Sequence, residues 1–165
     1  MKNKIIAISS WLIVAWMCKV FLLSLPYKFT KHPDTEHIFS TIGEWLSGIL
    51  GPSIGSLFAD YGSYVVGGFE LLVSLVLLSP ILIWVLRKLS GAEGSPRAKI
   101  HAYGGLMASA VMAGAVFFHL ATPLGVEVLH QGKSDGGSLF YAAVSILILG
   151  IVLFVINKPA SRESY

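Results

Sequence analysis

The sequence predicts an all-α integral membrane protein, a four-helix bundle with an additional amphipathic interfacial helix between the first and second spans. Hydrophobic residues make up 55% of the 165 residues and charged residues only 13%, whereas a soluble domain averages about 25% charged residues. Four apolar runs are each close to the roughly 20 residues that cross a bilayer as a helix. They use most of the chain, so we expect one transmembrane domain, with spans at 5–25, 64–86, 101–121 and 138–156.

The basic residues are distributed unevenly, which predicts the orientation of the chain. The termini and the connection between the second and third spans are cytoplasmic by the positive-inside rule, and segments 26–63 and 122–137 lie outside. The net charge of +3 therefore marks topology, and we assign it no nucleic-acid ligand. Eight basic residues fall on the cytoplasmic side, namely Lys2, Lys4, Arg87, Lys88, Arg97, Lys99, Lys158 and Arg162. Three fall outside, namely Lys28, Lys31 and Lys133.

The first apolar run resembles a secretory signal but lacks a small-residue cleavage site and is too long, so we expect an uncleaved helix. Its single cysteine, Cys18, excludes an intrachain disulfide. Lys19 lies six residues before Leu25, roughly 9 Å along a helix. Either it extends its ammonium to the outer interface or it pairs with a buried acid. Pairing with Glu70 is favoured, because Glu70 enters the second span from the same side.

The connection after the first span contains the predicted interfacial helix. Leu25-Pro26 should end the first span, and Asp34 or Thr35 can cap a new helix after Pro33. Its apolar residues follow helical spacing, so we expect this helix to lie on the outer membrane surface, anchored by Trp45. Gly51-Pro52 ends the helix, and 55–62 leads into the second span.

Polar residues inside the apolar runs are the candidate site. Glu70 shares a face of the second span with Gly67 and Ser74, so the acid should point into the bundle, where a lone carboxylate is costly. His119 ends a small-residue stripe on the third span, and Asp135 precedes the fourth. Antiparallel packing would gather Lys19, Glu70, His119 and Asp135 in the outer half of the bundle.

Two interpretations of this cluster stay open. It is either an ion pair and hydrogen-bond set that fixes helix register, or a polar pocket, open to the outer side, for a head group, a quinone ring or a small solute. The histidine placement excludes a bis-histidine haem within the chain. A metal bound by His32, Asp34 and His37 is disfavoured against a solvated loop, and no cofactor site is evident.

Several short motifs resemble the DoxX family of small bacterial four-helix membrane proteins. They cover most of the chain, while the segment 46–61 and Lys19 depart from the family pattern. The motifs are Lys28-Phe29-Thr30 with His32-Pro33, Phe39 and Gly43, Gly67-Gly68-Phe69-Glu70-Leu71, Leu77-Leu78-Ser79-Pro80, Met112-Ala113-Gly114-Ala115 with His119-Leu120, and Asp135-Gly136-Gly137.

The resemblance implies a bacterial inner-membrane location. It also implies that Lys28 and Glu70 occupy the positions that match the family pattern. Family relatives associated with membrane thiosulfate:quinone oxidoreductase imply an accessory subunit of a redox or quinone-linked system, with a partner membrane or redox subunit. The first alternative is a binding or transport module for a lipid or small solute. The second is an enzyme that uses Glu70 and His119 as acid and base.

Overall fold

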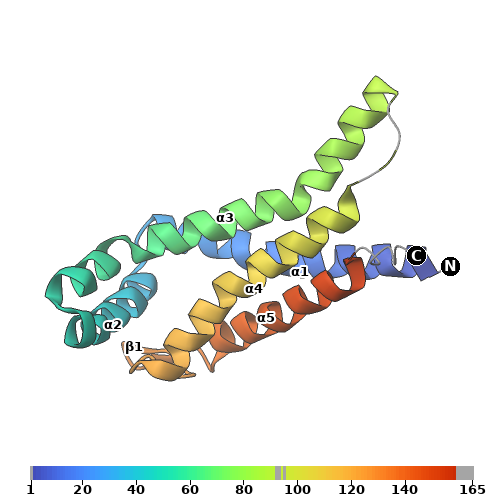
Figure 1. The fold of residues 1–165 in the computed structure, drawn as a ribbon. Helices are drawn as coiled ribbons and strands as arrows, with labels where there is room; N and C mark the ends of the chain where they lie inside the picture. Colours follow the sequence, from blue (N-terminus) through green and yellow to red (C-terminus); the bar gives the residue numbers. More distant parts are fainter. Residues whose placement is uncertain (1, 92–93, 95, 159–165) are drawn as a thin grey trace, which may run out of the picture.

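The computed structural model describes residues 2–91, 94 and 96–158, which form five helices and a two-stranded hairpin (Figure 1). Four of the helices are long and apolar enough to cross a membrane, which confirms the all-α class and the four apolar spans. Arg162, part of the topology prediction, lies outside the described residues. The elements are α1 (Lys2–Phe29), α2 (Pro33–Leu50), α3 (Pro52–Ser90), α4 (Arg97–Ala121), β1 (Leu129–His130), β2 (Lys133–Ser134) and α5 (Ser138–Asn157).

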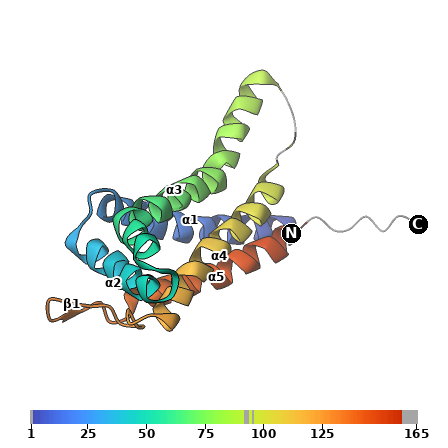
Figure 2. The same ribbon diagram turned by 60° about the vertical axis from the view of Figure 1, so that its left-hand side comes forward.

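The molecule has two distinct ends in both ribbon views (Figures 1 and 2). One end, called here the hairpin end, carries α2, the start of α3 and the β1–β2 hairpin. The other, the link end, carries the start of α1, the end of α3, the start of α4 and the end of α5. The hairpin end corresponds to the outer side in the orientation predicted from the basic residues.

The first helix does not end at Pro26, as the sequence predicted, but continues to Phe29. Proline lacks an N–H and removes one hydrogen bond of the helix, yet the next turn still forms, with Thr30 N–H and Oγ1 both bonded to the Pro26 carbonyl. This extra turn matters for the site. It keeps Lys28 on the same helix as Ser24, four residues earlier, so that both side chains lie on one face.

The predicted amphipathic helix exists as α2, but protein covers the part of its apolar face around Phe39 and Ile42, while Ile49 and Leu50 are exposed. α2 and the first half of α3 form a helical hairpin around Gly51. A Cβ on Gly43 would lie 2.6 Å from the Gly55 carbonyl oxygen, so only glycine permits this approach. The segment 55–62, expected to be a lead-in, belongs to the second helix of this hairpin, and α3 therefore has 39 residues. The place of α2 relative to a membrane stays a prediction.

Small residues hold α4 against its neighbours towards the link end. A Cβ on Gly104 would lie 2.7 Å from Leu77 of α3, and one on Gly105 would lie 2.6 Å from the Gly150 carbonyl of α5. Ser109 adds a hydrogen bond to the Leu147 carbonyl. The apolar core lies beside these contacts in the middle of the bundle, and towards the hairpin end α1 and α5 diverge (Figures 1 and 2).

A short hairpin in segment 122–137, which the sequence left as a loop, completes the hairpin end. β1 and β2 are antiparallel, with His130 opposite Lys133. Gln131 and Gly132 both have positive φ, 51° and 75°, as a two-residue hairpin turn requires. Asn-Gly and Asp-Gly are the strong sequence signals for such a turn, and Gln-Gly is a weak one.

Candidate functional site

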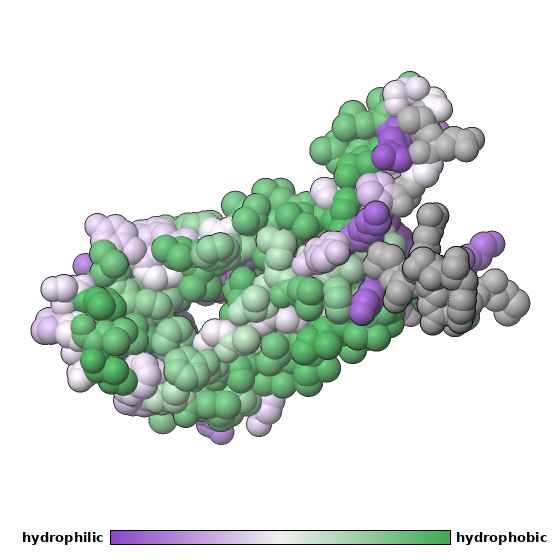
Figure 3. All heavy atoms as spheres, in the orientation of Figure 1, coloured by the Kyte–Doolittle hydropathy of each residue, from purple (hydrophilic) through white to green (hydrophobic). Residues whose placement is uncertain are grey.

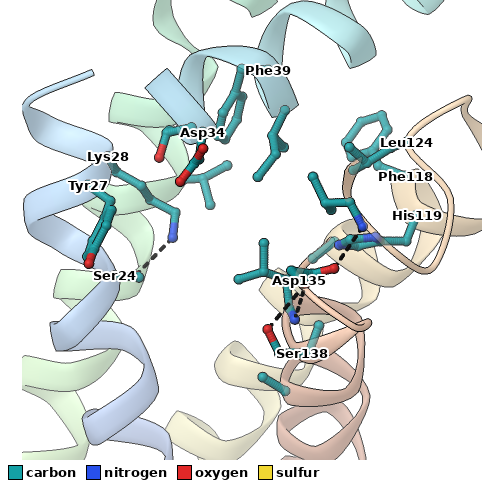
Figure 4. Close-up of a pocket in the computed structure, with 18 of the residues that line it drawn as sticks. Ser24, Tyr27, Lys28, Asp34, Phe39, Phe118, His119, Leu124, Asp135 and Ser138 are labelled. Atoms are coloured by element: carbon teal, nitrogen blue, oxygen red, sulfur yellow. Dashed lines mark hydrogen bonds between the residues drawn. The ribbon is translucent and has the colours of Figure 1, made fainter. Parts of the chain in front are cut away.

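A cavity of about 740 Å³ lies at the hairpin end, between α1, α2 and α3 on one side and α4, the hairpin segment and α5 on the other. Most of its lining is aliphatic or aromatic, and polar groups stand on both walls (Figure 4). The space-filling view shows the molecule hollowed at this end, with apolar residues around the hollow (Figure 3). Of the five predicted cluster residues, four line this cavity: Lys28, Glu70, His119 and Asp135.

The first polar wall is an ion pair between α1 and α3. Lys28 Nζ lies 2.9 Å from Glu70 Oε2, and the Ser24 hydroxyl donates to the same oxygen over 2.7 Å. Lys28 also donates to the Ser24 oxygen over 2.9 Å. Glu70 is buried, as predicted, with 4% of its surface exposed. A buried carboxylate is tolerated when it is paired with a cation and hydrogen-bonded. Here Lys28 is the cation and Ser24 donates the hydrogen bond.

Glycine at position 67 allows this ion pair to form. Gly67 lies on α3 one turn before Glu70, and a Cβ there would lie 3.3 Å from the Phe29 ring and 3.4 Å from Lys28 Cβ. The end of α1 therefore packs directly on the backbone of α3. This close approach brings the ammonium of Lys28 within reach of the carboxylate.

The predicted pairing of Lys19 with Glu70 is wrong. Lys19 is exposed, does not line the cavity, and its ammonium lies 5.7 Å from the centre of the Trp16 ring. The reason is the continuation of α1 past Pro26. The predicted first span, 5–25, ends before Lys28, which left Lys19 as the basic residue of that span expected to lie nearest to Glu70. The extra turn supplies a closer partner from the same helix.

The second polar wall is built by the end of α4 and the start of α5. His119 is buried, and its Nδ1 lies 2.7 Å from the Gly125 carbonyl oxygen. Because a carbonyl only accepts, Nδ1 carries the proton, and in the neutral ring Nε2 is an acceptor. His119 therefore presents a ring of fixed orientation to the cavity that it lines.

Asp135 organises the return of the chain into α5. Its carboxylate accepts hydrogen bonds from the N–H groups of Val128, Gly137 and Leu139, at 2.8, 3.0 and 3.0 Å, and from the Ser138 hydroxyl at 3.2 Å. Partial burial works to raise the pKa of Asp135, but these hydrogen bonds outweigh it and hold the pKa below its ordinary value. Its first role is therefore structural, because it fixes the wall that carries Ser138.

A polar contact joins the two sides of the cavity at an exposed edge. His130 Nδ1 of β1 donates to Asp34 Oδ1 of α2 over 2.7 Å, and His37 stacks on the His130 ring with centroids 4.7 Å apart. The hydrogen bond from His130 lowers the pKa of Asp34. Among the described residues, no group of three or more His, Cys, Asp or Glu side chains is arranged to hold a metal ion.

The cavity also reaches the lateral surface between α1 and α5. Leu23 of α1 and Leu139 of α5 both line it and are 62% and 46% exposed. Nearer the middle of the bundle, Trp16 Nε1 of α1 donates to Ser145 Oγ of α5 over 3.0 Å and brings the two helices together. From this bond towards the hairpin end the two helices diverge (Figures 1 and 2).

Sequence reasoning missed Ser24, Tyr27, Asp34 and His130 as cavity residues. Ser24 was detectable, because it lies one helical turn before Lys28. The Asp34–His130 contact was not, because 96 residues separate its partners and no spacing rule joins them.

Comparison with protein-family models, with curated proteins and with solved structures gives no significant match to this chain. The assignment of a function therefore rests on the geometry of the cavity.

Proposed function

We propose that this chain is a membrane-embedded binding module that takes a small, mainly apolar molecule with a polar end into the cavity at the hairpin end. The observation that carries the proposal is the cavity itself. Its volume of about 740 Å³ is within the roughly 300–1,000 Å³ of small-molecule sites, which are likewise apolar with a few placed polar groups. A quinone or a lipid with a small head group has this chemistry.

The arrangement of the walls supports a ligand that enters from the membrane. The lateral opening between Leu23 and Leu139 is apolar, so an apolar body can pass it without leaving the hydrocarbon layer. Lys28, Ser24 and His119 then offer hydrogen-bonding groups to the polar end, from opposite walls (Figure 4). Both walls are pre-organised by their own bonds, which reduces the ordering cost of binding.

A cavity-filling substitution tests the proposal. Gly114 lines the cavity, and a Cβ there meets no atom within 4 Å, so Gly114→Leu places a side chain in open space. Gly68→Leu is the matched control, because Gly68 is also helical and open but does not line the cavity. Both changes raise helix propensity equally.

The measurement is native mass spectrometry of the gently extracted protein, followed by solvent extraction and identification of the bound molecule, with decylubiquinone as an added probe. We expect a bound lipid or quinone in the wild type and in Gly68→Leu, and at least a tenfold loss of occupancy in Gly114→Leu. Equal occupancy in both variants, or an empty wild type that also fails to take up the probe, would contradict the proposal.

The accessory role implied by the DoxX resemblance remains a second proposal, with the same location in a bacterial inner membrane and cytoplasmic termini. The observation that favours it is the cavity, because its size and polar ends suit a quinone. A stoichiometric partner subunit in the same mass spectra would support it. The enzymatic alternative has less support, since Glu70 is held by Lys28 and His119 by Gly125 within separate walls.

A further inference from the structure

We propose a second binding site, for the head group of an anionic phospholipid, at the link end of the molecule. The site is a groove of about 240 Å³ between α3 and the rest of the bundle, far from the cavity described above. Its lining comes from three helices and combines aromatic, aliphatic and cationic side chains: Trp11 of α1, Pro80, Ile81 and Trp84 of α3, and Arg97 of α4.

The groove exists because α3 leaves the bundle. Leu77 still packs against Gly104 of α4, but about one turn later Pro80 lies within the helix, which continues to Ser90. Proline removes a helical hydrogen bond and bends the helix away from its own side. The carbonyl of Val76 that loses its donor accepts a hydrogen bond from the Ser79 hydroxyl. Beyond this point the end of α3 projects away from α1 and α4 in both views (Figures 1 and 2).

The side chains on this projecting arm suit lipid chains. Ile81, Leu82, Trp84 and Leu86 are all at least half exposed, and within a membrane their surroundings are acyl chains. The space-filling view shows a mostly apolar arm, with hydrophilic residues near its end and where it joins the body (Figure 3). In this proposal the chains of the lipid contact the arm, and its head group lies at Arg97 in the groove.

The charge at the link end selects an anionic head group. In the part of the chain that the structure describes, all seven acidic residues lie on α2, on α3 as far as Glu70, or in segment 122–137. The charged residues described at the link end are basic. In the full sequence, segment 87–100 contains four basic residues and one acidic one. Basic pockets between helices at a membrane face are typical sites for anionic lipid head groups.

Arg97 is the residue expected to contact the phosphate. It lines the groove, and one guanidinium N–H donates to Asn157 Oδ1 over 3.2 Å, which fixes its position. Asn157 is in turn held by Ser10 and by the Leu153 carbonyl. A planar guanidinium binds phosphate through parallel hydrogen bonds. The tryptophans at the groove match the preference of indole for the membrane interface.

The test compares phosphatidylglycerol with phosphatidylcholine of identical chains, added to the purified full-length protein and counted by native mass spectrometry. We expect the wild type to bind phosphatidylglycerol more tightly, and Arg97→Gln to lower this preference about fivefold, the effect of one basic residue near an anionic surface. Arg97→Lys should keep most of it. Equal binding of the two lipids by the wild type would overturn the proposal.

Lys99→Gln is the matched control, because Lys99 is basic and close in sequence but exposed and outside the groove. It should change the preference much less than Arg97→Gln does. If the two variants lose the same amount of the preference for phosphatidylglycerol, the lipid is attracted by general surface charge and the groove is not its site. Circular dichroism confirms that each variant is folded.

A quenching experiment locates the lipid without relying on Arg97. A variant in which Trp16 and Trp45 are replaced by phenylalanine keeps only the two groove tryptophans, Trp11 and Trp84, and should be quenched more by brominated phosphatidylglycerol than by brominated phosphatidylcholine in mixed vesicles. Equal quenching would contradict the site. Gly114→Leu should leave this difference unchanged, so failure of the cavity proposal and failure of this one are distinguishable.

Discussion

The two ends of the bundle differ in how closely α1, α4 and α5 pack together. Near the link end, Gly104, Gly105 and Gly150 bring helix backbones into contact, and the buried Asn157 of α5 donates to Ser10 of α1. At the hairpin end, buried polar groups such as Glu70 and His119 are hydrogen-bonded and surround a cavity. Tight contacts at one end therefore allow the helices to diverge at the other without loss of the bundle.

The largest expected effect comes from breaking the ion pair at the cavity. Lys28→Met leaves Glu70 buried without its cation, and we expect a loss of about 3 kcal/mol in the free energy of unfolding. Adding Glu70→Gln should recover much of this loss, because the uncompensated charge is then removed. The measurement is unfolding in mixed detergent micelles.

Lys19→Met is the control for that experiment. Lys19 is exposed beside Trp16, so its replacement should change stability by less than about 0.5 kcal/mol. If Lys19→Met cost as much as Lys28→Met, the assignment of Lys28 as the partner of Glu70 would be wrong.

A smaller effect is expected where the helices are in contact. Gly105→Ala places a Cβ 2.6 Å from the Gly150 carbonyl, and overpacking of this kind costs about 1–3 kcal/mol. Gly114→Ala, on the same helix but in open space, should instead stabilise by about 0.5–1 kcal/mol through helix propensity. Thermal unfolding in detergent compares the two, and a shift of the same sign in both would contradict the contrast between the ends.

The smallest expected effect concerns the carboxylate that holds the hairpin segment on α5. Asp135→Asn keeps one acceptor oxygen but loses the charge-assisted hydrogen bonds, at a cost of about 1–2 kcal/mol. Because the folded pKa of Asp135 is lowered, its stabilisation is present above the ordinary pKa and is lost as the pH falls through the folded value.

Acid titration of stability checks this sign. The difference between wild type and Asp135→Asn should be full near neutral pH and shrink as the pH falls from about 5 towards 2. Asp60→Asn serves as the control, since Asp60 is an exposed carboxylate on α3. A difference that persists unchanged in acid would mean that Asp135 acts through shape and not through charge.

The sequence by itself determined the helical class, the four apolar spans, the amphipathic helix and the burial of Glu70, because each follows from local composition or from helical periodicity. Only the tertiary structure decided that Glu70 pairs with Lys28 and not Lys19, that Asp34 meets His130, and that a cavity separates the two polar walls. These depend on whether a helix continues past a proline and on how closely glycines let helices approach. Both are properties of packing between distant segments, to which sequence spacing gives no access.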